Sequence, residues 1–213
     1  MKFEMRVTDE AMSYLSEKDP ILGKYITTVG PLVRSGIKDP YIATVDCILS
    51  QQISAKAYQT IAGRFYEKFK DADPELILNS EFEELRSVGL STPKANYIRG
   101  IAQARLDKTV DFDGLHDLSF DEIKEILTSL KGVGRWTVEM ICIFTLQRLD
   151  VMSYDDLAIR NGIKRLYHKK EVTKDFFNEL NELYSPYQSY ASFYLWHASQ
   201  LKEDFEAVTN KQL

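Results

Sequence analysis

The segment that decides how we expect the chain to fold is Leu127-Thr128-Ser129-Leu130-Lys131-Gly132-Val133-Gly134-Arg135-Trp136-Thr137. Hydrophobic periodicity predicts one helix over 119–129 and a second helix that begins at Arg135, so only a short turn joins them. Gly132 and Gly134 suit such a turn, because glycine adopts positive φ and lets other backbone or ligand atoms approach closely. The sequence therefore predicts two helices in direct succession, connected by a tight Gly-Val-Gly hairpin.

Helical periodicity extends over most of the remaining chain. Apolar residues recur every four positions between 57 and 69, with polar residues on the other faces. Similar patterns predict further helices over 8–18, 41–50, 54–69, 93–106, 135–149, 157–166, 173–184 and 187–201. The only strand-like stretch, 108–113, is short and isolated. We therefore predict an all-α fold.

Composition excludes several classes of protein. The chain has 213 residues and only two cysteines, which rules out a disulfide scaffold, a four-cysteine zinc site and a cysteine-ligated iron–sulfur cluster. The start lacks the apolar core of a signal peptide, and no apolar run reaches membrane-spanning length, so we expect a cytoplasmic protein. The net charge of −5 argues against coating nucleic acid by bulk attraction, but it allows a grip through a few placed cations, with Lys94 and Arg99 as outlying candidates.

The hairpin itself is a candidate anion site. A helix that starts at Arg135 presents free backbone N–H groups and the positive end of its dipole just after Gly134. Lys131 and Arg135 add charge on either side of Gly132, and Thr137 adds a hydroxyl. A plain helical hairpin closed by glycine is the simpler alternative. The pattern favours a dinucleotide-binding site least, because no strand precedes the turn and the third glycine is missing.

The whole string 130–137 resembles the helix–hairpin–helix of base-excision DNA glycosylases, and within that superfamily it is most similar to the alkylbase branch, the 3-methyladenine DNA glycosylase II type. Other segments resemble the family in the expected order. They are Asp19-Pro20 at its start, 48–54 with its lesion-probing loop, 151–160 with its catalytic segment, and 186–196 with its closing helix. The resemblance implies two helical lobes with an active-site cleft between them. One lobe combines residues 1–39 and 149–213 and carries the catalytic aspartate, and the other, 40–148, carries the hairpin.

This resemblance implies a monofunctional DNA glycosylase that flips out alkylated purines, such as 3-methyladenine and 7-methylguanine, during base excision repair. Breaking the N-glycosidic bond leaves an oxocarbenium-like sugar, which a carboxylate stabilises while it orients water. The family pattern assigns this role to Asp156, with Asp155 as the cap of the following helix or an auxiliary group. Glycosylases with lyase activity carry a lysine at the position of Trp136, so we expect no strand cleavage here.

The resemblance also suggests which residues bind the flipped base and which side chain fills the gap that the base leaves in the stack. Trp136 and Trp196 match positions that line the base pocket, and aromatic faces attract cationic bases. Met140 and Tyr154 are further candidates for the pocket wall, and a place in the core is the usual alternative for the two tryptophans. Gln52 matches the position of the side chain that fills the vacated stack, where some relatives carry leucine, and Gln51 is the alternative.

The expected partners are few. Double-stranded DNA with damaged bases is the substrate, and monomer is the default state. In this superfamily hairpin carbonyls can hold a monovalent cation, here those of Thr128, Leu130 and Val133, and no other cofactor is expected. Two other functions remain open: a glycosylase for deaminated or oxidised bases, and a non-catalytic hairpin module that only binds DNA.

Overall fold

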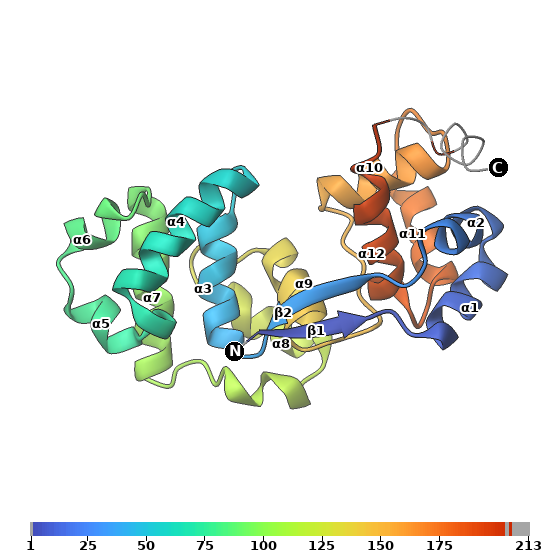
Figure 1. The fold of residues 1–213 in the computed structure, drawn as a ribbon. Coiled ribbons are helices and arrows are strands. Elements are labelled where there is room, and N and C mark those ends of the chain that lie inside the picture. Colours follow the sequence, from blue (N-terminus) through green and yellow to red (C-terminus); the bar gives the residue numbers. More distant parts are fainter. Residues whose placement is uncertain (1, 203–204, 206–213) are drawn as a thin grey trace. The chain divides into compact units, whose positions relative to one another are not determined.

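The computed structural model describes residues 2–202 and 205, and this part of the chain is predominantly helical (Figure 1). Its α-helices are α1 (Asp9–Lys18), α2 (Pro20–Val29), α3 (Pro40–Ser50), α4 (Ala55–Lys68), α5 (Pro74–Asn79), α6 (Phe82–Ser87), α7 (Thr92–Leu106), α8 (Phe120–Thr128), α9 (Arg135–Phe144), α10 (Leu157–Leu166), α11 (Lys174–Leu183) and α12 (Gln188–Ala198). Two short 3-10 helices, η1 (Lys70–Ala72) and η2 (Asp113–Asp117), lie between them. Strands β1 (Lys2–Arg6) and β2 (Val33–Ile37) form a two-stranded sheet. The predicted all-α class is confirmed, with this small sheet as an addition.

The described chain divides into two compact units. Unit 1 comprises Lys2 and Ile37–Leu146, and unit 2 comprises Phe3–Gly36 and the described residues from Gln147 onward. The hairpin belongs to unit 1, whereas the Asp155-Asp156 pair belongs to unit 2. None of the described helices has both the length and the apolar character needed to cross a membrane.

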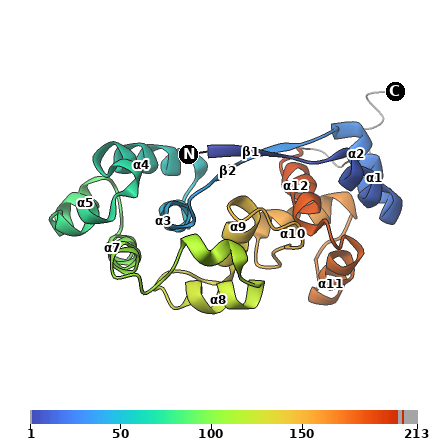
Figure 2. The same cartoon turned by 90° about the horizontal axis from the view of Figure 1, so that it is seen from below.

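Unit 1 is organised around α3, which packs against α4, α7 and α9. Pro40 occupies the first turn of α3, and the Asp39 carboxylate caps that helix by accepting from the amides of Tyr41 and Ile42 at 2.8 and 3.1 Å. The next turns bury Val45, Ile48 and Leu49 completely. Figure 2 shows α8 and α9 side by side, joined by the short hairpin that their sequence predicts.

Unit 2 is built on α12, which packs against α10 and α2 (Figure 1). Helix α12 buries residues on every side, as expected for a helix in the middle of a core. The buried Asp19 carboxylate caps α2 and also accepts hydrogen bonds from the hydroxyls of Tyr184, at 2.9 Å, and Tyr167. These bonds link the N-terminal and C-terminal segments of this unit.

Several predicted element boundaries were wrong. Helices α2, α5 and α6 were not predicted; α2 begins at Pro20, in the first turn of the helix where proline is tolerated, and the other two have only six residues each. Helix α9 ends at Phe144 rather than 149, and Gln147 has a positive φ of 56°. The strand-like stretch 108–113 forms no strand, since Lys108 has φ 54° and η2 begins at Asp113.

Helices α10 and α12 approach each other unusually closely at Gly162. A Cβ at this position would overlap the backbone carbonyl of Leu195, which cannot move without moving α12. Glycine costs helix stability relative to alanine by about 1 kcal/mol, so its presence inside α10 needs a compensating reason. Close packing of the two helices supplies that reason.

We expect Gly162→Ala to lower the free energy of unfolding by about 2 kcal/mol, because overpacking against a fixed backbone outweighs the gain in helix propensity. Urea denaturation measures the change. Gly100→Ala in α7 is the matched control, since nothing lies within 4 Å of its Cβ position, and it should stabilise by about 0.5–1 kcal/mol. Equal effects of the two substitutions would contradict the close packing.

Candidate functional site

The hairpin between α8 and α9 uses its two glycines differently. Gly132 has φ 89°, and a Cβ there would overlap the ring of Tyr97 on α7. Gly134 is the N-cap of α9 with φ −104° and ψ 177°, an ordinary extended conformation, and nothing lies within 4 Å of its Cβ position. The fold therefore requires glycine at 132, whereas at 134 the absent side chain leaves open space in front of a helix N-terminus.

Two predicted cations flank this turn. Lys131 is exposed, and Arg135 is 62% exposed along its side chain. The Arg135 Nε donates to Glu139 Oε1 at 2.8 Å, and that carboxylate is buried one helical turn further along α9. Glu139 orients the guanidinium from one side. The rest of the Arg135 side chain is exposed to solvent at the start of α9.

The Thr137 prediction needs correction. Its side chain is buried, and its Oγ1 accepts a hydrogen bond at 3.3 Å from the Gln51 amide. The same Gln51 Nε2 donates to the Gly132 carbonyl at 3.0 Å. The Thr137 hydroxyl therefore faces the interior of unit 1 and is not offered to a phosphate.

The loop between α3 and α4 has two glutamines with different environments. Gln51 is the C-cap of α3 and is half-buried through its bonds to the hairpin. Gln52 is exposed and has φ 55°, a left-handed conformation that is uncommon for a residue with a side chain. Ser54 then caps α4 by accepting from the Ala57 amide at 3.2 Å.

The two outlying cations bind backbone carbonyls within unit 1. Lys94 Nζ donates to the carbonyls of Leu49 and Gln51 at 2.9 and 2.7 Å, and burial lowers the pKa of this ammonium below its ordinary value. Arg99 donates to the carbonyls of Leu78 and Ser80 at 3.1 and 3.3 Å. Both side chains cap helix ends, so the structure gives no reason to keep them as phosphate ligands.

Asp156 is the most constrained carboxylate of the predicted catalytic segment. It is 9% exposed and is the N-cap of α10, where its Oδ1 accepts from the Ile159 amide at 2.9 Å. The same oxygen accepts from the indole Nε1 of Trp196 at 3.0 Å. Asp155 is exposed and does not cap α10, so the expectation that Asp155 is the cap was wrong. The reason is that Asp156 directly precedes the first helical residue.

The candidate pocket residues lie in different surroundings. Trp196 is half-buried on α12 with its ring next to Phe193, while Trp136 is half-buried in the first turn of α9. Met140, one turn after Trp136, is 7% exposed. The Tyr154 ring packs edge-on against Phe177 and beneath the Arg160 guanidinium, so most of its faces are already covered within unit 2.

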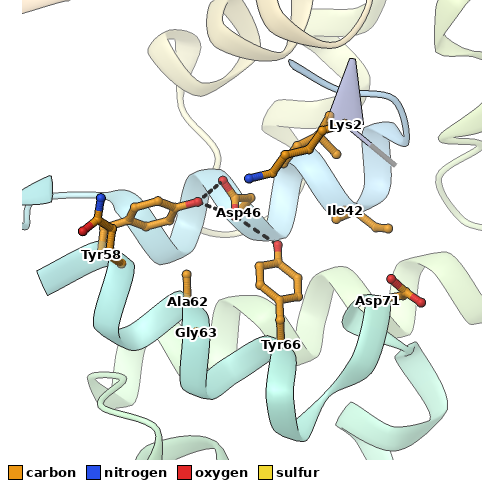
Figure 3. A pocket seen from close by; sticks show the side chains of 10 residues that line it. Lys2, Ile42, Asp46, Tyr58, Ala62, Gly63, Tyr66 and Asp71 are labelled. Carbon is orange, nitrogen blue, oxygen red and sulfur yellow. Dashed lines mark hydrogen bonds between the residues drawn. The ribbon is translucent and has the colours of Figure 1, made fainter. Parts of the chain in front are cut away.

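Unit 1 also contains a cavity of about 390 Å³ that sequence reasoning missed (Figure 3). Asp46 on α3 accepts hydrogen bonds from the Tyr58 and Tyr66 hydroxyls at 2.8 and 3.0 Å, and Lys2 directs its ammonium toward the same carboxylate. Burial raises the pKa of Asp46, while the two tyrosines and Lys2 oppose that shift. The two tyrosine hydroxyls satisfy the Asp46 carboxylate, so we assign the cluster a structural role within unit 1.

The described residues, 2–202 and 205, contain no group of three or more histidine, cysteine, aspartate or glutamate side chains that could hold a metal ion. The groups predicted to bind a monovalent cation are backbone carbonyls of the hairpin, not side chains. The Leu130 carbonyl accepts from the Val133 amide at 3.1 Å and keeps a second lone pair, so it remains able to bind such an ion.

Residues 45–186 match the family model described as HhH-GPD superfamily base excision DNA repair protein. This chain belongs to that superfamily. It is 34% identical to DNA-3-methyladenine glycosylase 1 of Schizosaccharomyces pombe, over 94% of this chain and 90% of the relative. A solved S. pombe 3-methyladenine DNA glycosylase in complex with abasic DNA has a TM-score of 0.84 at 34% identity, covering 91% of this chain and 98% of that one. The DNA-3-methyladenine glycosidase of Bacillus halodurans has a TM-score of 0.80 at 30% identity, with 93% of each chain covered.

The structure gives two residues contacts that the sequence did not predict. Gly162 sets the distance between α10, which begins after Asp156, and α12, which carries Trp196. Lys94 binds the end of α3 just before Gln52. A glycine inside a helical pattern was a usable signal for the first, but nothing local distinguishes Lys94 from any other lysine in the first turn of a helix.

The hairpin glycines should respond differently to substitution. Gly132→Ala should lower the free energy of unfolding by about 2–3 kcal/mol, because it combines a strained φ with overlap against Tyr97. Gly134→Asn should keep the stability, because asparagine is a good N-cap, yet weaken duplex DNA binding by occupying the N-terminal amides and the open space. Urea denaturation and fluorescence anisotropy measure the two effects. Unchanged DNA affinity in Gly134→Asn would exclude this end of α9 as a phosphate site.

Proposed function

We propose that the protein is a monofunctional DNA glycosylase that hydrolytically excises alkylated purines, of the 3-methyladenine and 7-methylguanine type, from damaged duplex DNA. The observation that carries the proposal is the arrangement of Asp156, a buried carboxylate fixed by the first turn of α10 and by the Trp196 indole. Membership of the superfamily and the names of the relatives support the same chemistry.

In this proposal Asp156 stabilises the positive charge that develops on the sugar as the base leaves. An alkylated purine is already electron-poor, so the reaction needs support for the sugar more than protonation of the leaving group. The carboxylate then orients water for attack on the sugar carbon, which leaves an abasic site. The hydrogen bonds from the Ile159 amide and the Trp196 indole share one oxygen of Asp156 and hold the carboxylate in a single orientation.

Unit 1 supplies the DNA-binding elements of the proposal. The N-terminus of α9, with Gly132, Gly134, Lys131 and Arg135 around it, binds backbone phosphates. Gln52 fills the gap left by the flipped base, since it is exposed, whereas Gln51 is held by the hairpin. Carbonyls of Thr128, Leu130 and Val133 are the proposed site of a monovalent cation, which would add positive charge facing the phosphates.

The remaining assignments follow the superfamily. Trp136 and Trp196, with Met140 and Tyr154, are the proposed base-pocket residues, and Asp155 is auxiliary. Because Trp136 replaces the lysine that forms a Schiff base in lyase relatives, the proposed reaction stops at the abasic site. The substrate places the protein where the cell keeps its DNA, in the cytoplasm of a bacterium or the nucleus of a eukaryote.

Asp156→Asn separates catalysis from capping. Asparagine retains the side-chain oxygen that accepts from Ile159 and Trp196, so folding and affinity for abasic duplex should be preserved. Loss of the charge should lower the single-turnover rate of base release by about two to four decades. Chromatography of free bases from methylated duplex DNA measures that rate, and gel electrophoresis should show unbroken strands for the wild type.

Asp155→Asn is the matched comparison, because it removes the same charge one residue away from an exposed position, and as an auxiliary group it should slow base release far less than Asp156→Asn does. A wild-type protein that binds abasic duplex but frees no alkylated base would contradict the proposed substrate. Activity on deaminated or oxidised duplexes would then indicate another glycosylase, and inactivity on all of them a binding module.

A further inference from the structure

The loop that carries Gln52 is anchored at two points. Lys94 reaches from the first turn of α7 and donates to the carbonyls of Leu49 and Gln51, the last acceptors at the C-terminal end of α3. Gln51 donates its side-chain amide to the Gly132 carbonyl and the Thr137 hydroxyl of the hairpin. The anchored residues, Leu49 and Gln51, lie within three positions of Gln52, and all of these groups belong to unit 1.

These bonds have a consequence for the backbone at Gln52. A left-handed φ of 55° costs roughly 1 kcal/mol for a residue with a Cβ, and it persists only when neighbouring contacts fix it. Lys94 fixes the peptide immediately before Gln52, because its ammonium binds the Gln51 carbonyl at 2.7 Å. Ser54 fixes the other side as the cap of α4. The exposed Gln52 side chain therefore projects from a loop with defined ends.

The Gln51 bonds relate this loop to the phosphate-binding turn. Gly132 has a positive φ that residues with a side chain rarely adopt, and the ring of Tyr97 occupies the space where its Cβ would lie. Because the Gln51 side chain bonds directly to the Gly132 carbonyl, it keeps the distance between the hairpin and Gln52 constant. When the hairpin binds the DNA backbone, that distance determines where along the duplex the Gln52 side chain enters.

We propose that Lys94 and Gln51 are positioning residues for base flipping, which hold Gln52 at a fixed distance and direction from the hairpin, an inference that rests on the proposed glycosylase function. Neither side chain touches the lesion. Lys94 acts through the Gln51 carbonyl and Gln51 acts through the hairpin, and together they present Gln52 in the conformation that fills the vacated stack.

The test is a double-mutant cycle in the full-length protein. Lys94→Met removes the ammonium at similar volume, Gln51→Met removes the donors to the hairpin, and Gln52→Ala removes the side chain that is positioned. Each variant is combined with Gln52→Ala. Flipping is followed by the fluorescence of 2-aminopurine beside a lesion in duplex DNA, and base release is measured in single turnovers at saturating enzyme.

We expect Lys94→Met and Gln51→Met each to slow flipping and base release about tenfold, since small displacements of a positioned group have effects of this size or larger. In the Gln52→Ala background neither substitution should slow the reaction further, because the group that they position is gone. If the rate reductions of the two single substitutions multiply in the double variants, the proposal is overturned. Wild-type rates in both Lys94→Met and Gln51→Met would also overturn it.

Arg99→Met is the control for a general loss of stability. Arg99 lies on the same helix, is equally half-buried and also caps a helix end, but at α5 and away from Gln52. It should lower the free energy of unfolding about as much as Lys94→Met while flipping stays at the wild-type rate. Equal slowing of flipping by Arg99→Met would assign the Lys94 effect to stability and overturn the proposal.

The two readouts separate this inference from the function on which it rests. A wild-type protein that flips the base without releasing it would contradict the proposed excision, and the fluorescence cycle would still decide the roles of Lys94 and Gln51. A wild-type protein that does not flip the base at all would overturn both.

Discussion

The hydrogen bond from the Trp196 indole to Asp156 is the interaction on which the orientation of this carboxylate depends. It joins the N-terminus of α10 to α12, and it uses the same carboxylate oxygen that caps α10 through the Ile159 amide. Hydrogen bonds to a charged group contribute about 1.5–3 kcal/mol when buried, so two of them strongly favour one orientation. Capping and catalysis are therefore compatible uses of one side chain.

The two helices that this bond joins also approach each other closely at Gly162. Gly162 allows that distance, because any Cβ there would meet the Leu195 carbonyl. The same device occurs between α1 and α2, where a Cβ at Gly23 would lie 2.8 Å from the Ser16 backbone. Gly162 thus sets the distance between the two helices that hold Asp156 and Trp196, although it takes no part in the proposed chemistry.

Sequence patterns predicted the features that depend on local chemistry. The Gly-Val-Gly hairpin and the long amphipathic helices follow from backbone preferences and periodicity. The patterns failed where tertiary contacts decide. Thr137 is polar at a helix start, yet its hydroxyl bonds Gln51 in the interior. Asp155 was expected to cap α10 because Asp156 was assigned to catalysis, yet Asp156 is the cap. The roles of Lys94 and Gln51 depend on segments more than forty residues away.

The central claim is that Asp156 stabilises a positively charged sugar, and a charged mimic of that sugar tests it most directly. We would measure the affinity for duplex DNA carrying a pyrrolidine abasic analogue, which is cationic at neutral pH, relative to the neutral tetrahydrofuran analogue. Enzymes bind mimics of the transition state more tightly than neutral counterparts. The account predicts that the wild type prefers the cationic duplex and that Asp156→Asn loses this preference. An equal preference for the cation in both proteins would contradict it.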